Sequence, residues 1–72
     1  RLDAKAFEPG DVVTWLIRGK LTHIGVVTNL PVEGKPDHLL ILHNIGAGPQ
    51  LEDALFRWPI TGHYRYPGPT KR

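Results

Sequence analysis

Two neighbouring segments of this chain each read as a β-strand that carries one histidine. Leu21–Asn29 has the sequence LTHIGVVTN and contains His23, and Leu39–Gly48 has the sequence LLILHNIGAG and contains His43. The intervening Leu30–Asp37 holds two prolines and a glycine, which is typical of a loop. Because sequential strands joined by a short loop usually pair antiparallel, we expect the two histidines to meet across the strand pair.

The length of the chain bounds what it can form. With 72 residues and 8.1 kDa it is at most one domain, 1–72, with a sheet expected over about 8–67 and frayed ends. A chain this short buries only roughly 60% of the surface of its unfolded form. The sequence has no cysteine, hence no disulfide and no thiolate nucleophile. Since it begins at Arg1 and not at methionine, we expect a processed or excerpted piece.

The charge pattern argues against two classes of interaction. Nine basic residues stand against seven acidic ones, which gives a formal charge of +2 and a pI of about 9.3. Nucleic-acid-binding domains concentrate basic and aromatic side chains on one face, and the sequence has no such stripe, so we expect no nucleic-acid partner. No apolar run approaches the roughly 20 residues that cross a bilayer, so we expect no transmembrane segment.

The first third of the chain reads as a turn followed by a hairpin. Glu8–Asp11 (EPGD) has turn chemistry, and the apolar, β-branched run Val12–Ile17 (VVTWLI) follows it as a strand. A polar reversal at 18–20 (RGK) then joins this strand to the strand of His23.

The last third is less regular. Gln50–Ala54 is polar and predicts a turn or a short helical piece, whereas Leu55–Trp58 (LFRW) predicts a fourth strand. Ile60–Tyr66 predicts a closing strand, and Pro67–Arg72 is a tail with prolines and a glycine. The whole pattern indicates four or five short strands in a small antiparallel sheet or partial barrel.

Alternation along the two histidine strands places particular side chains together. His23 and Gly25 share one face of the first strand, and Ile41 and His43 share one face of the second. The aliphatic run 38–43 reads as buried on both faces. Because glycine weakens a strand interior, Gly25 indicates that another group packs closely against the histidine face.

The histidine pair has a structural and a functional interpretation. Histidines in small sheets are commonly satisfied or half-exposed side chains without a chemical role. In the functional interpretation one imidazole is a general base and a second polar group fixes its tautomer and orientation. The base needs a nucleophile, but the hydroxyls of Thr22, Thr28 and Thr61 lie in no serine-type motif. The residues alone therefore predict an acid/base site without its nucleophile.

A zinc site is an alternative that the histidines leave open. No two of them have the i, i+4 spacing of helical zinc peptidases, and no cysteine is available as a ligand. We therefore expect no metal and no cofactor, although a three-histidine site stays open. The histidines concerned are His23, His38, His43 and His63.

Aromatic side chains provide a second alternative, a binding groove. They are candidates to line a sugar or peptide groove, and core or edge packing is their simpler role. A non-catalytic SH3-like β-barrel that binds cell-wall peptide or a protein partner through them is thus a competing interpretation. The aromatic residues are Trp15, Trp58, Tyr64 and Tyr66.

The order of the short motifs resembles that of the NlpC-type, papain-like cell-wall cysteine peptidases. EPGDVVTW is similar to their strand opening, THIGVVTN to their catalytic-histidine strand, and LLILHNIG to the next strand, whose polar residue orients that histidine. The run through HNIGAGPQLED, LF and ITGHYRY resembles the C-terminal half of the bacterial domain-of-unknown-function family 1287, usually placed in that superfamily. The likeness covers nearly all of residues 7–67.

This resemblance implies a fold, a site and a substrate. The fold is an α+β papain-like domain, of which this chain supplies the sheet. His23 is the catalytic base, His43 orients it, Asn44 supports it, and the helix that bears the nucleophilic cysteine packs beside Gly25. That cysteine is expected upstream of residue 1, on an N-terminal segment or a second chain, so that these 72 residues alone are inert. The implied substrate is the peptide stem of peptidoglycan, and the implied location is extracytoplasmic.

Overall fold

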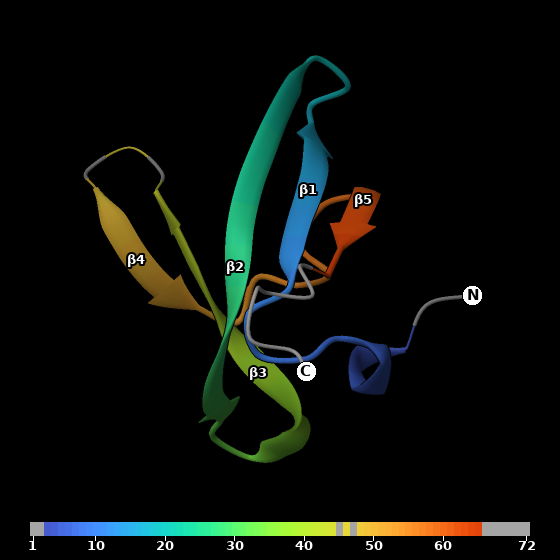
Figure 1. Ribbon diagram of the computed structural model, residues 1–72. Helices are drawn as coiled ribbons and strands as arrows, with labels where there is room; N and C mark the ends of the chain where they lie inside the picture. Colours follow the sequence, from blue (N-terminus) through green and yellow to red (C-terminus); the bar gives the residue numbers. More distant parts are fainter. Residues whose placement is uncertain (1–2, 45, 47, 66–72) are drawn as a thin grey trace.

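The computed structural model describes residues 3–44, 46 and 48–65, which form a five-stranded antiparallel sheet with almost no helix (Figure 1). The strand order across the sheet is β4-β3-β2-β1-β5. This confirms the predicted antiparallel sheet, whereas Tyr66 and the predicted tail lie outside the described residues. The elements are the 3-10 turn η1 (Ala4–Ala6) and the strands β1 (Val12–Ile17), β2 (Leu21–Val32), β3 (Lys35–Asn44), β4 (Pro49–Glu52) and β5 (Ile60–Tyr64).

The hairpin of β2 and β3 is longer than the sequence indicates. The predicted loop over 30–37 is wrong, because Val32 pairs with Lys35 and only two residues, Glu33 and Gly34, connect the strands. Pro31 is tolerated inside β2 because the register shifts on both sides of it, where a missing backbone donor disturbs the ladder least. In Figure 1 β2 runs the length of the molecule, and β3 returns beside it.

The segment after β3 departs from the prediction in two places. Residues 50–52, predicted as part of a turn or helical piece, belong to β4, which pairs antiparallel with β3. Residues 55–58, predicted as a strand, lie in a turn. The Leu55 carbonyl accepts a hydrogen bond from Trp15 Nε1 at 2.8 Å, and the Arg57 amide donates to the Ala54 carbonyl at 3.1 Å. These backbone groups are satisfied without a neighbouring strand.

The core lies on one face of the sheet and is centred on the fully buried Trp15. Gly25 lies against this tryptophan: a Cβ at Gly25 would stand 2.9 Å from Trp15 Cη2 and 2.8 Å from Ile41 Cγ2. The chain's own tryptophan thus makes the close approach that the glycine indicated. The buried apolar residues are Ala4, Phe7, Val13, Trp15, Val27, Ile41, Ala54 and Leu55.

The opposite face of the sheet carries an apolar row that crosses all five strands. Leu42 of β3 lies in this row and is 43% exposed, so the expectation that the third strand is buried on both faces is wrong. The strand is aliphatic on both faces, but the described chain covers only the face of Ile41 and His43. Cross-strand pairing sets the row as Tyr64, Val12, Val26, Leu42 and Leu51.

Asp11, immediately before β1, connects the beginning and the end of the described chain through its side chain. Its buried carboxylate accepts hydrogen bonds from Arg65 Nε at 2.9 Å and Arg65 Nη2 at 2.7 Å, and lies 2.6 Å from His63 Nε2. The backbone amide of Glu8 donates to it at 2.9 Å. The hydrogen bonds from Arg65 are the main cause that holds the pKa of Asp11 far below its ordinary value of 3.8. No helix among the described residues is long and apolar enough to cross a membrane.

Candidate functional site

The two predicted histidines meet on the core face of the sheet. His43 of β3 pairs directly with Gly25 of β2, so His23, two residues before that glycine, is its diagonal neighbour on the same face. Because Gly25 has no side chain, nothing stands between the two rings. His23 Nε2 lies 2.8 Å from His43 Nδ1. The expected contact between the histidines is therefore present.

Glu52 extends this pair into a row of three. It lies on β4 opposite Ile41, which places its carboxylate diagonal to His43. His43 Nε2 lies 2.8 Å from Glu52 Oε1, and Arg57 Nη1 donates to the same oxygen at 3.1 Å. The hydrogen bond from His43, then that from Arg57, lowers the pKa of Glu52. The carboxylate is thus held in its ionised form, which only accepts hydrogen bonds.

An ionised Glu52 fixes the tautomers of both rings. His43 must carry its proton on Nε2 to donate to the carboxylate, which leaves its Nδ1 as an acceptor. His23 must then donate from Nε2 to that acceptor, so its own Nδ1 carries the lone pair. Among the described residues, no side chain hydrogen-bonds to His23 Nδ1. The row therefore orients His23 as a base with a defined basic atom.

The surroundings of His23 keep it neutral. Burial lowers the pKa of this histidine, and charge repulsion from His43 lowers it further. Trp15 stands 5.6 Å and Trp58 5.4 Å from the His23 ring, measured between centroids. Both indoles also border His43, whose side chain is fully buried. Aromatic walls restrict both rings, which is what a preorganised base requires.

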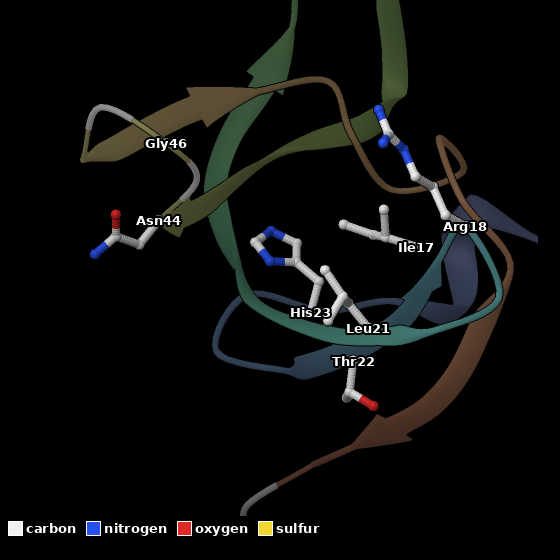
Figure 2. Close-up of a pocket in the computed structure, with 7 residues that line it drawn as sticks. All are labelled: Ile17, Arg18, Leu21, Thr22, His23, Asn44 and Gly46. Atoms are coloured by element: carbon white, nitrogen blue, oxygen red, sulfur yellow. The ribbon is translucent and has the colours of Figure 1, made fainter.

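A pocket of about 420 Å³ opens beside His23. Figure 2 shows the His23 imidazole pointing into it, with Ile17 and Leu21 on one side. The walls come from β1, the β1–β2 turn, the start of β2 and the end of β3. The lining residues are Ile17, Arg18, Leu21, Thr22, His23, Asn44 and Gly46.

Comparisons with known proteins decide the family. A family model described as a domain of unknown function, DUF1287, matches residues 1–66. The chain belongs to the DUF1287 family. It is similar to YijF of Escherichia coli (strain K12), described as an uncharacterized protein, with 49% identity over 61 residues, or 83% of this chain. The match covers 28% of YijF, so this DUF1287 chain spans little more than a quarter of that relative. No solved structure matches the chain.

The DUF1287 site does not gather every residue that the sequence suggested. Asn44 follows His43 on β3 and faces the other way, and Figure 2 shows its amide pointing away from the His23 ring. Trp15 and Trp58 both border the histidines, but Tyr64 belongs to the apolar row on the opposite face. The structure therefore brings together the histidines and the tryptophans. Asn44 lines the same pocket as His23 without turning its amide to the ring, and Tyr64 lies on the opposite face of the sheet.

The three threonines do not supply a nucleophile to His23. Thr28 Oγ1 donates to the Leu40 carbonyl at 2.8 Å, and Thr61 Oγ1 lies 3.0 Å from Thr14 Oγ1. Thr22 precedes His23 on β2, and its side chain points away from the ring (Figure 2). None of these three hydroxyls thus points at the His23 imidazole, although Thr22 lines the same pocket.

The remaining histidines lie in separate environments. His38 stands beside Asp53, with 3.8 Å between Nδ1 and Oδ1, whereas His63 bonds to Asp11. A zinc site made of three histidines is therefore not assembled. Within the residues that the structure describes, no group of three or more His, Cys, Asp or Glu side chains is arranged to hold a metal ion.

Sequence reasoning missed Glu52 and Arg57. The polar segment PQLE has low strand propensity, so β4 and the face of Glu52 were not predicted. The two-residue spacing between Gln50, which pairs with His43, and Glu52 would have revealed the carboxylate had β4 been recognised. The signal was present in the acidic pair of LEDAL, but it depended on a register that only the sheet supplies.

Proposed function

We propose that this DUF1287 chain is the sheet half of a papain-like, NlpC-type cysteine peptidase or amidase that cleaves the peptide stem of peptidoglycan. The observation that carries the proposal is the row His23–His43–Glu52, which leaves the lone pair of His23 Nδ1 directed away from its partners. A base held by a second polar residue is what a cysteine nucleophile needs for activation. Resemblance to the NlpC-type peptidases supplies the substrate class and the extracytoplasmic location.

His23 serves this chemistry in two steps. Its Nδ1 takes the proton of a cysteine thiol, and the resulting imidazolium is stabilised through His43 by the ionised Glu52. The thiolate attacks the carbonyl carbon of the scissile amide, and the imidazolium then protonates the leaving amine as the acyl-enzyme forms. A water molecule, deprotonated by His23, hydrolyses the thioester and regenerates the thiol.

The cysteine is placed by this proposal on a helix upstream of residue 1. The printed sequence has no cysteine, and the chain spans 28% of YijF, so the relative contains additional sequence. The positions of the threonines also favour a nucleophile from outside these 72 residues, because no threonine side chain among the described residues points at Nδ1 of His23. The pocket beside His23 is the place where the thiol and the scissile bond meet.

The test uses a polypeptide that extends this chain upstream to include the cysteine. Purified peptidoglycan is incubated with it, and new amino groups are measured together with the mass of the released fragments. We expect release that His23→Ala abolishes and His43→Ala weakens. His38→Ala is the matched control, because this histidine lies outside the row and its loss leaves the reaction intact. Undiminished release by the His23→Ala variant contradicts the mechanism.

The competing function, a non-catalytic SH3-like binding module, receives less support from the geometry. Trp15 is fully buried and Tyr64 lies on the opposite face, so these aromatic side chains do not share one groove. That alternative predicts binding of wall peptide by the 72-residue chain with an affinity that His23→Ala leaves unchanged. Calorimetric measurement of wall-peptide binding to the 72-residue chain and to its His23→Ala variant tests this alternative.

A further inference from the structure

Arg18 gives the pocket beside His23 a positive charge. It lies in the turn between β1 and β2 and lines the same pocket as the base. The other lining residues are apolar, polar without charge, or the neutral His23, and no acidic residue is among them. Any ligand group that enters this pocket therefore meets one fixed charge, and that charge is a guanidinium.

The guanidinium of Arg18 has no carboxylate to hold within the described part of the chain. The other two arginines described there are both paired, Arg57 with Glu52 and Arg65 with Asp11 and Glu8. No ion pair of the described residues includes Arg18. Arg18 is exposed, and none of its five donors is held by an acceptor side chain among the described residues.

The backbone at Arg18 is unusual for an arginine. Its φ is 55°, and that of Gly19 is 65°, while the Lys20 amide donates to the Ile17 carbonyl at 3.0 Å. Positive φ at both central residues favours Asn, Asp and Gly, which adopt it with less strain than arginine. Residues held in such conformations cluster at ligand sites. A less strained residue would serve the turn alone, so the arginine side chain itself points to a role.

We propose that Arg18 makes this pocket a subsite for a free carboxylate of the substrate, next to the bond that His23 helps to cleave. This inference rests on the proposed function. A guanidinium fork binds a carboxylate through two parallel hydrogen bonds, which gives it direction as well as charge. Ile17 and Leu21 form apolar walls that accommodate the hydrocarbon part of the same substrate residue. The substrate class is thus a peptide with an unamidated carboxylate beside the scissile amide.

The test compares two substrates that differ in one charge. A peptidoglycan stem peptide and the same peptide with its side carboxylates converted to carboxamides are given to the extended, cysteine-bearing polypeptide. We expect at least a tenfold higher kcat/KM for the acid form, mainly through KM. Arg18→Asn, which removes the charge and suits the turn, abolishes this preference by lowering kcat/KM for the acid form alone. Equal loss for both peptides, or an unchanged preference, overturns the assignment.

One control distinguishes the charge of Arg18 from a general effect of changing the turn, and a second distinguishes substrate binding from cleavage. Lys20→Asn removes a cation from the same turn but outside the pocket, and we expect it to keep the preference for the acid form. Calorimetric binding of both peptides to the 72-residue chain needs no nucleophile. If neither peptide is cleaved but the acid form binds more tightly through Arg18, the proposed function fails and the subsite stands. Equal binding of both peptides overturns the subsite.

Discussion

The imidazole of His43 lies 2.8 Å from the carboxylate of Glu52, on the opposite side of the ring from His23. This contact determines which ring nitrogen carries the proton in both His43 and His23. It also joins three strands that are consecutive in sequence, because His23 lies on β2, His43 on β3 and Glu52 on β4. The hairpin of β2 and β3, together with the short strand β4, thus holds the imidazole of His23 in one orientation.

The first prediction concerns the tautomers. Both His23 and His43 are expected to carry their proton on Nε2 in the neutral chain, because Glu52 accepts only from that atom of His43. Imidazole nitrogen chemical shifts measured by NMR near pH 7.5 report this directly. Glu52→Gln keeps an acceptor oxygen and retains the pattern, whereas Glu52→Ala loses it. A protonated Nδ1 on His23 in the unmodified chain would overturn the assignment of the basic atom.

The second prediction concerns the titration of His23. Its pKa is lowered by burial first and by His43 second, so we expect an NMR titration midpoint below the ordinary value of 6.5. Because the pKa is lower in the folded chain, the unfolded chain takes up a proton on His23 first as the pH falls. Burial of the neutral ring therefore lowers the free energy of unfolding only below about the ordinary pKa of 6.5. His43→Asn removes the second cause and moves the midpoint partly back toward 6.5. A midpoint at or above 6.5 in the unmodified chain contradicts the environment described.

The third prediction concerns Gly25. Alanine there would bring its Cβ within 3.0 Å of the Trp15 ring and of Ile41, in the tightest part of the core. We expect Gly25→Ala to lower the free energy of unfolding by about 1–3 kcal/mol, the usual cost of overpacking. Urea denaturation followed by tryptophan fluorescence measures it. Ile24→Ala, at the neighbouring exposed position, is the control and should cost about 0.5 kcal/mol or less.

The fourth prediction concerns Asp11 and acid. Because the folded pKa of Asp11 is depressed, its contribution to stability is fully present above the ordinary value of 3.8 and is lost as the pH falls from there toward the lowered value. Asp11→Asn removes a charge that Arg65 and His63 both contact, and we expect a loss of about 2 kcal/mol at pH 7. The difference in the free energy of unfolding between the two proteins should stay constant from pH 7 down to about pH 4 and should begin to narrow only below the ordinary pKa of 3.8. The exposed Asp37→Asn variant should follow the unmodified chain throughout.

Part of this structure could be predicted from the sequence, and the reason is periodicity. The alternation of side chains placed His23 with Gly25 and Ile41 with His43, and the expected antiparallel pairing of the two strands predicted the contact between the histidines. The glycine was also informative, because Trp15 and Ile41 pack closely against Gly25.

The rest depended on tertiary contacts that local propensity does not contain. The segment PQLE forms β4 because it pairs with β3. The segment LFRW has higher strand propensity but forms a turn, in which the Leu55 carbonyl accepts a hydrogen bond from Trp15 Nε1. Pro31 lies within a strand because the ladder is irregular there. Glu52 was missed for the same reason as β4, since its position beside His43 exists only in the paired sheet.

The reactivity of the thiol tests the central claim, that His23 is a base for a cysteine, most directly. In the extended polypeptide, the rate of alkylation by iodoacetamide is measured from pH 5 to pH 10 with and without His23→Ala. The account predicts that the unmodified protein reacts rapidly well below the ordinary thiol pKa of about 8.5, and that His23→Ala moves the rise in rate back to that range. Identical profiles for the two proteins would contradict it.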